Sequence, residues 1–180
     1  MPERIMLCDL RRQYQPLREE IMAAIDDIFQ KMQLNLGPNV RAFEREWADL
    51  CGVTHAIGVD NGTDALMLAL HAYGLGKGDE VITPANTFIA VVEAIYNVGA
   101  TPVIVDVNPD TYNIDVAAME AAITSRTRMI VPVHLYGMPA DMDAINAIAK
   151  PKGIIVLEDA SQSQGARYKG RRVGALGDAA

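Results

Sequence analysis

The sequence predicts an α/β fold in which a mainly parallel sheet has helices on both faces. Beyond residue 52, short apolar runs alternate with helical segments, and five such runs occur. Strands that are joined by helices run parallel, and the helices then cover both faces of the sheet. The 180 residues are enough for one domain with its own core. No internal repeat, low-complexity tract or linker interrupts them.

Residues 1–52 are predicted to form a helical segment that packs on this domain. Apolar residues recur at helical spacing between Leu17 and Met32, with acidic residues beside them. The tripeptide Leu-Gly-Pro at residues 36–38 interrupts that pattern. A second amphipathic helix follows and ends at Gly52. Its apolar face carries Val40, Phe43, Trp47 and Leu50.

The five apolar runs are predicted to be the strands of the sheet. The last of them is bounded by Gly153 and by acidic residues, which indicates a buried strand. The second begins at Val81, behind a glycine-containing turn at residues 76–79. The runs are residues 55–60, 81–83, 103–107, 129–135 and 154–157.

Four helices are predicted between these strands. The first is almost wholly apolar and is closed by Gly74, and the second stops at Gly99. Asp115 is expected to cap the third, because its side chain can accept a hydrogen bond from the first helical turn. Pro151 ends the fourth. The four helices are residues 63–73, 86–98, 116–123 and 141–150.

Composition argues against several classes of protein. The formal net charge is −7, whereas nucleic-acid binding needs a basic stripe, so no nucleic-acid partner is expected. The longest apolar stretches, such as residues 21–25 and 129–133, are too short to cross a bilayer. The charged N-terminus does not resemble a signal peptide, and Cys8 and Cys51 are expected to be free thiols. We therefore expect a cytoplasmic protein without membrane contact.

The first candidate binding element is the junction at residues 60–65, Asp-Asn-Gly-Thr-Asp-Ala, between a predicted strand and a predicted helix. Backbone N–H groups at a helix N-terminus are unpaired and lie at the positive end of the helix dipole, so they suit a phosphate. Gly62 would let the ligand approach closely, and the Thr63 hydroxyl could donate a further hydrogen bond. The alternative is that Thr63 or Asn61 only caps the helix.

The second junction, residues 84–88, puts Phe88 at the start of a predicted helix. An aromatic side chain in that place can lie flat against a planar ring. The alternative is that Phe88 belongs to the hydrophobic core, where phenylalanine side chains more often lie.

The third junction, residues 158–162, follows the last predicted strand. Neighbouring strand residues point to opposite faces, so Glu158 and Asp159 cannot share one role. Asp159 stands at the carboxyl end of a parallel strand, where α/β proteins bind ligands, and a carboxylate there can keep a heteroaromatic nitrogen protonated. Gln162 could form a hydrogen bond with a ring oxygen. The alternative is that Asp159 only caps a turn.

All three junctions lie at the carboxyl ends of predicted strands. In a parallel sheet these ends face the same side. We therefore expect the side chains of Thr63, Phe88, Asp159 and Gln162 to line one cleft.

Other kinds of site are not indicated. His55, His71 and His134 lack metal-ligand spacing, so no metal site is predicted. No serine or cysteine has the context of a nucleophile elbow, and no G-x-G-x-x-G motif follows a strand.

A set of motifs occurs in a specific order along the chain. They are Leu-Gly-Pro at 36–38, Phe-Glu at 43–44, Asn-Gly-Thr-Asp-Ala-Leu at 61–66, Gly-Asp-Glu-Val-Ile at 78–82, Thr-Phe at 87–88, Gly-Ala-Thr-Pro at 99–102, Asp-Val-Asn-Pro-Asp-Thr-Tyr-Asn-Ile-Asp at 106–115, Pro-Val-His-Leu-Tyr-Gly at 132–137, Glu-Asp-Ala-Ser-Gln at 158–162 and Gly-Ala-Leu-Gly-Asp at 174–178. In this combination the chain resembles the N-terminal half of the PLP-dependent sugar aminotransferases of the DegT/StrS type, which make amino sugars from keto-sugar nucleotides. The resemblance implies that residues 53–180 are an incomplete PLP-binding large domain of the aspartate aminotransferase type.

The resemblance also implies pyridoxal 5'-phosphate as the cofactor. The residues implied are Gly62, Thr63 and Asp64 for the phosphate, with Asp64 acting through its backbone, Phe88 for stacking on the ring, Asp159 for the pyridinium nitrogen and Gln162 for the ring hydroxyl.

The family's Schiff-base lysine would follow Asp178 by a few residues and would therefore lie beyond Ala180. Lys150, Lys152 and Lys169 do not match its position, and Lys169 is expected in a surface hairpin turn. We interpret the sequence as a fragment of a PLP-dependent nucleotide-sugar aminotransferase whose catalytic residue is unknown.

By the same resemblance, the complete enzyme would use a keto-sugar nucleotide and an amino donor such as glutamate, and would be a homodimer. One alternative is a related PLP-dependent sugar dehydratase, in which histidine replaces the lysine. Another is a non-catalytic PLP-binding or dimerisation fragment. The resemblance further implies that the strand at residues 55–60 pairs with the last strand of the sheet, which would follow Ala180.

Overall fold

The computed structural model describes residues 6–180. The chain divides into two compact units, one up to Phe43 and one over Glu44–Ala180. Part of the predicted N-terminal segment, including the stretch that argues against a signal peptide, lies outside the described residues. The packing of that segment on the rest of the chain stays a prediction.

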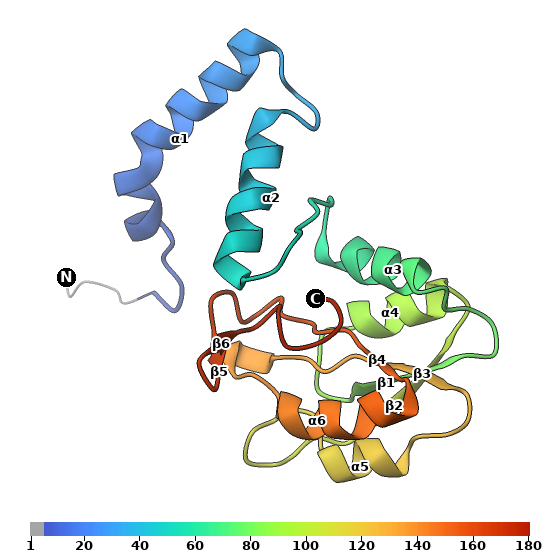
Figure 1. Ribbon diagram of the computed structural model, residues 1–180. Helices are drawn as coiled ribbons and strands as arrows, with labels where there is room; N and C mark the ends of the chain where they lie inside the picture. The colour runs from blue at the N-terminus through green and yellow to red at the C-terminus, as the bar shows by residue number, and fades with distance from the viewer. Residues whose placement is uncertain (1–5) are drawn as a thin grey trace. The chain divides into compact units, whose positions relative to one another are not determined.

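The first unit contains α1 (Arg11–Lys31) and the beginning of α2 (Pro38–Cys51), which are labelled in Figure 1. Both helices that the apolar spacing predicts are therefore confirmed. Met32 follows the last residue of α1 and caps the helix in a left-handed conformation with φ of 51°. In its last turn Lys31 forms an ion pair of 2.8 Å with Asp27, one helical turn earlier, an arrangement that stabilises a helix modestly.

The second unit is built on a parallel sheet in the order β2-β1-β3-β4. The strands are β1 (Glu80–Pro84), β2 (Thr101–Val105), β3 (Thr127–Ile130) and β4 (Ile155–Val156). All neighbouring pairs are parallel, because a helix separates each strand from the next along the chain. The predicted fold class is confirmed.

Helices cover both faces of this sheet (Figure 1). The helices α3 (Gly62–Ala72) and α4 (Ala90–Asn97) lie on one face, and α5 (Val116–Ala121) and α6 (Met142–Ala149) lie on the other. Side chains alternate along each strand. Val81 and Met129 therefore join the core beneath α3 and α4, whereas Ile82 and Ile130 join the core beneath α5 and α6.

Polar side chains begin three of these helices. Asn61 accepts a hydrogen bond from the Asp64 backbone N–H at the start of α3. Asp115 does the same for Ala118 in α5, as its position in the sequence predicts, and Asp141 does so for Ala144 in α6. Such caps satisfy N–H groups that have no partner within the helix.

One predicted strand is absent. Residues 55–60 form no strand, so the sheet has four strands instead of the predicted five. A strand needs a neighbour to accept its backbone hydrogen bonds, and no described strand pairs with this segment. Its two largest apolar side chains remain exposed, with Ile57 82% and Val59 42% accessible to solvent. The pattern in the sequence was therefore insufficient by itself to form this strand.

Several element ends also differ from the prediction. β2 ends at Val105, and Val107 instead makes an isolated antiparallel bridge with Ile114. β3 ends at Ile130, and the expected strand residue Leu135 begins a short 3-10 helix, η1 (Leu135–Gly137). A second 3-10 helix, η2 (Lys150–Lys152), follows α6. α4 begins at Ala90, four residues later than predicted.

A two-stranded antiparallel hairpin follows the sheet. Its strands are β5 (Arg167–Tyr168) and β6 (Arg171–Arg172). Lys169 and Gly170 form its turn with φ values of 48° and 85°, and glycine adopts this left-handed conformation at little cost. The predicted hairpin turn at Lys169 is confirmed.

Candidate functional site

A pocket of about 230 Å³ lies beyond the carboxyl ends of the parallel strands. Its lining comprises Gly62, Thr63, Leu66, Thr87, Phe88, Ala90, Val133, Asp159, Ser161 and Gln162. Five of the six residues singled out by the sequence are among them. The expectation that Thr63, Phe88, Asp159 and Gln162 line one cleft is therefore confirmed. Phe88 follows β1, and Asp159 and Gln162 follow β4, whose carboxyl ends face this side of the sheet. Thr63 reaches the same cleft although residues 55–60 before it form no strand.

Asp159 lines this pocket with a carboxylate of which only one oxygen is hydrogen-bonded within the described part of the chain. Its backbone is fixed on both sides, since its N–H donates to Pro132 and its carbonyl accepts from His134. Its Oδ1 accepts two hydrogen bonds from Ser161, one from the backbone N–H at 3.1 Å and one from the hydroxyl at 2.6 Å. Oδ2 accepts none from a described residue. Asp159 thus caps a turn with one oxygen and keeps the other available for a ligand.

The Gln162 side chain is oriented by a backbone group that sequence reasoning missed. Its Oε1 accepts a hydrogen bond of 2.8 Å from the Tyr136 N–H. Tyr136 adopts a left-handed conformation with φ of 55°. Because the oxygen is engaged, the amide NH₂ is the group that can donate to a ligand.

The amino end of α3 lies at the same pocket. Asn61 caps this helix, as one alternative predicted, because its Oδ1 accepts a hydrogen bond of 2.9 Å from the Asp64 N–H. The N–H groups of Gly62 and Thr63 form no hydrogen bond with another described residue. They are therefore the donors that this helix end offers to an anion.

Asp64 itself is not brought to the pocket. Its N–H already donates to Asn61 Oδ1, and its carboxylate accepts 2.9 Å from the Asn61 amide. The expected contact of its backbone with a phosphate stays a prediction. Such a contact would require the capping bond to be shared or exchanged.

Phe88 lies in the loop between β1 and α4, and 69% of it is accessible to solvent. The interpretation of Phe88 as a core residue is therefore wrong. A large exposed aromatic ring at a pocket provides a flat apolar surface for a planar ligand. Beside it, the Thr87 hydroxyl oxygen is buried without a hydrogen-bond partner among the described residues.

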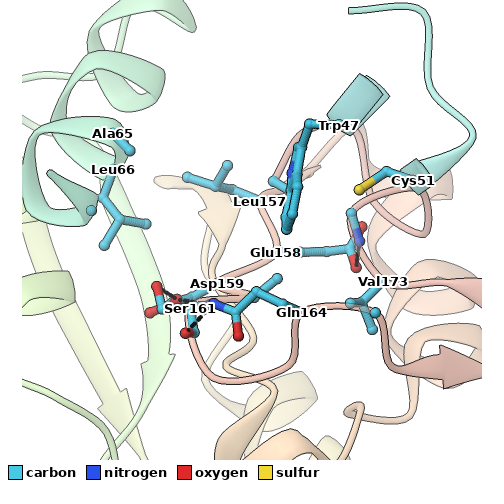
Figure 2. A pocket seen from close by; sticks show the side chains of 15 residues that line it. Trp47, Cys51, Ala65, Leu66, Leu157, Glu158, Asp159, Ser161, Gln164 and Val173 are labelled. Carbon is cyan, nitrogen blue, oxygen red and sulfur yellow. Dashed lines mark hydrogen bonds between the residues drawn. The ribbon is translucent and has the colours of Figure 1, made fainter. Parts of the chain in front are cut away.

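A second cavity of about 220 Å³ adjoins the first and shares Gly62, Leu66, Asp159 and Ser161 with it. Figure 2 shows the Trp47 ring and the Cys51 side chain on one side of this cavity and Leu66 on the other. Asp159 borders both cavities, so a ligand in either one can reach it. Most of the exposed lining is apolar, which raises the electrostatic effect of that carboxylate.

The model of the DegT/DnrJ/EryC1/StrS aminotransferase family matches residues 15–180. The chain belongs to this family.

Curated relatives within the DegT/DnrJ/EryC1/StrS family are named after aminotransferases. A UDP-N-acetyl-3-dehydro-alpha-D-glucosamine 3-aminotransferase of Acidithiobacillus ferrooxidans is 52% identical over 97% of this chain and 47% of its own length. A dTDP-3-amino-3,4,6-trideoxy-alpha-D-glucose transaminase of Streptomyces venezuelae is 48% identical over 96% of this chain and 45% of its own length. The chain therefore spans about half the length of the curated relatives that it matches.

Solved members of the family have the same fold. The S. venezuelae DesV structure, which is in complex with a ketimine intermediate, has a TM-score of 0.93 and 48% identity, over 96% of this chain and 46% of that chain. NtdA from Bacillus subtilis, solved with bound cofactor PMP, has a TM-score of 0.80 and 40% identity, over 82% of this chain and 34% of that chain. The fold is thus that of part of the large domain of the aspartate aminotransferase type.

The lysines singled out in this family member lie away from the pocket. Lys169 lies on the β5–β6 hairpin, donates a hydrogen bond of 2.6 Å to the Asp143 carboxylate and lines a different pocket. The hydrogen bond to Asp143 raises the Lys169 pKa, which opposes the loss of a proton that a nucleophilic amine needs. Lys150 and Lys152 are exposed in η2. The expectation that Lys169 is not the catalyst agrees with this geometry.

No helix among residues 6–180 is long and apolar enough to span a membrane. Within the same residues, no three His, Cys, Asp or Glu side chains gather in a way that could hold a metal ion.

Proposed function

We propose that this chain forms the N-terminal half of a PLP-dependent aminotransferase that transfers an amino group to a keto-sugar nucleotide. The observation that carries the proposal is the pocket that unites Thr63, Phe88, Asp159 and Gln162. Family membership supports it, because the named relatives act on nucleotide sugars.

The chemistry of the pocket fits pyridoxal 5'-phosphate group by group. The phosphate needs N–H donors, and those of Gly62 and Thr63 have no other described partner. The ring needs a flat apolar surface, which Phe88 offers. The ring nitrogen needs an anionic acceptor, and Asp159 Oδ2 is available. The ring oxygen needs a donor, and the Gln162 NH₂ group is oriented for that role by the Tyr136 N–H.

When bound, the cofactor supplies an electron sink for the carbanion that forms during amino-group transfer. Asp159 holds a proton at the ring nitrogen, because a carboxylate favours the charged form of its partner. Ser161 keeps that carboxylate in place through two hydrogen bonds. Phe88 excludes water from one face of the ring, and the positive end of α3 binds the phosphate.

The amine that links the cofactor covalently is proposed to come from a residue outside this chain, by resemblance to the family. The chain by itself would then bind the cofactor without catalysing transfer. We propose a cytoplasmic homodimer with an amino donor such as glutamate. These further features rest on the family alone.

The test uses the full protein that contains this sequence. We expect the wild type to bind one pyridoxal 5'-phosphate per subunit and to form 2-oxoglutarate from glutamate when a keto-sugar nucleotide is present. Asp159→Asn is expected to lower kcat by about 100-fold or more, since the ring nitrogen loses its anionic partner.

The matched control is Asp115→Asn, which alters a helix-capping aspartate outside the pocket and is expected to affect stability only. A wild-type protein that binds no pyridoxal 5'-phosphate would refute the proposal. Bound cofactor with sugar dehydration instead of transfer would favour the related dehydratase.

A further inference from the structure

Glu158, the neighbour of Asp159, carries a buried carboxylate that has no role in the proposed chemistry. The residue is 1% exposed, yet its side chain accepts four hydrogen bonds. Oε1 accepts from the backbone N–H groups of Leu176 and Gly177, both at 2.7 Å. Oε2 accepts from the Gly174 N–H at 3.0 Å and from His134 at 2.9 Å. Figure 2 shows the Glu158 side chain turned away from Asp159 and toward Val173.

His134 is a neutral donor in this network. Its Nδ1 accepts a hydrogen bond of 3.1 Å from the Ala140 N–H, so Nδ1 carries no hydrogen. The hydrogen must then be on Nε2, which points at Glu158. The ring is fully buried, and both of its nitrogens are engaged. The imidazole therefore holds Glu158 through a hydrogen bond and supplies no compensating positive charge.

The carboxylate is held in its ionised form. Burial raises the Glu158 pKa, but the hydrogen bonds from His134, Gly174, Gly177 and Leu176 together outweigh burial, so that the pKa lies below its usual value of 4.5. Only an ionised carboxylate accepts on both oxygens from four donors. A buried charge is costly unless such hydrogen bonds satisfy it.

These bonds attach the segment 174–180 to the end of β4. The attachment continues beyond Glu158, because the Val156 N–H donates to the Asp178 carboxylate and the Glu158 N–H donates to the Ala179 carbonyl. Gly177 lies so close to β4 that an added Cβ would stand 2.5 Å from the Val156 carbonyl oxygen. Ala180 then lines the same cavity as Asp159.

We propose that Glu158 and His134 are positioning residues, which fix the segment 174–180 relative to the Asp159 carboxylate. Asp159 and Glu158 are adjacent along the backbone. The hydrogen bonds of Glu158 therefore fix the distance between Asp159, on one wall of the cavity, and Ala180, on another. The inference rests on the proposed function, because positioning matters only if Asp159 contacts a cofactor. It assigns a role to two residues that lie outside the pocket lined by Thr63, Phe88 and Gln162.

The test compares two identical substitutions in the full protein. In Glu158→Gln an amide NH₂ group replaces one carboxylate oxygen. Whichever oxygen it replaces, the new donor faces two hydrogen-bond donors. His134 cannot turn its Nε2 into an acceptor without losing the hydrogen bond that Nδ1 accepts from Ala140. We expect the Kd for pyridoxal 5'-phosphate to rise about tenfold or more, with a shifted absorption of the bound cofactor and a lower kcat.

The control is Glu80→Gln. Glu80 is also buried, and Thr124 and Arg126 bind its carboxylate, but it stands at the amino end of β1 and lines neither of the two cavities that Asp159 borders. We expect Glu80→Gln to lower the thermal midpoint while leaving Kd and kcat within about twofold of the wild type.

Gly177→Ala tests the same inference by a second route, and its cofactor affinity decides the matter if Glu158→Gln does not fold. It displaces the segment from β4 without changing a charge, and we expect the same loss of cofactor affinity. Glu158→Gln or Gly177→Ala with the same Kd, absorption and kcat as Glu80→Gln would overturn the inference alone. A wild type that binds no pyridoxal 5'-phosphate would instead overturn the proposed function on which it rests.

Discussion

The Ser161 hydroxyl donates a hydrogen bond of 2.6 Å to Asp159 Oδ1, and the Ser161 N–H donates to the same oxygen. One residue thus engages one oxygen of the carboxylate twice, and the other oxygen accepts no hydrogen bond from a described residue. The two residues stand two positions apart in a turn, so the arrangement is local and does not depend on distant packing.

Removing this hydroxyl tests how much the orientation of Asp159 matters. Ser161→Ala keeps the backbone donor and is expected to weaken pyridoxal 5'-phosphate binding by about 1.5 kcal/mol, roughly tenfold in Kd. Ser163→Ala is the control, since Ser163 is buried nearby but its hydroxyl donates to the Ala160 carbonyl outside the pocket. Equal Kd values for the two variants, measured by equilibrium dialysis, would contradict the assignment.

Phe88 is expected to affect binding without affecting stability. Its ring is 69% exposed, so Phe88→Ala removes little buried surface and should leave the thermal midpoint unchanged. The loss of ring stacking should cost about 0.5–1.5 kcal/mol of cofactor affinity. Phe88→Tyr should retain it. A destabilised Phe88→Ala protein with normal affinity would mean that the ring supports the fold instead.

Lys169 is expected to be dispensable for chemistry. Its amino group pairs with Asp143 and lies 5.0 Å from the centre of the Tyr168 ring, on the β5–β6 hairpin. Lys169→Met should therefore leave cofactor content and kcat unchanged in the full protein. Borohydride reduction followed by peptide mapping checks this directly. Labelling of Lys169 would show that the catalytic amine lies within this chain.

Glu158 predicts a specific dependence of stability on pH. Its folded-state pKa lies below the usual 4.5, so its contribution is fully present above that value and is lost as the pH falls through the lower, folded-state pKa. The difference in unfolding free energy between wild type and Glu158→Gln should be constant near neutral pH and should shrink below 4.5. Denaturant titrations at several pH values measure it. A difference that stays the same as the pH falls below 4.5 would contradict the role assigned to the ionised form.

The sequence predicts the positions of Phe88, Asp159 and Gln162 well because a topological rule governs them, whereas Thr63 reaches the pocket although residues 55–60 before it form no strand. Ligands bind beyond the carboxyl ends of parallel strands, and alternating apolar runs are enough to locate these ends. Cap residues such as Asp115 are equally local. Their partner lies within four residues, so the sequence around them contains the information.

The features that the sequence did not predict depend on distant partners. Residues 55–60 have the composition of a strand but lack a described neighbour, so pairing and not propensity decides their structure. The four donors to Glu158 come from residues up to 24 positions away, and nothing in a run such as Leu-Glu-Asp distinguishes that carboxylate from a capping one.

A crystal structure of the full protein with pyridoxal 5'-phosphate tests the central claim most directly. We predict that the ring lies against Phe88, that its nitrogen is within hydrogen-bonding distance of Asp159 Oδ2, and that the phosphate accepts from the N–H groups of Gly62 and Thr63. A cofactor bound elsewhere, or one whose ring nitrogen faces away from Asp159, would contradict the account.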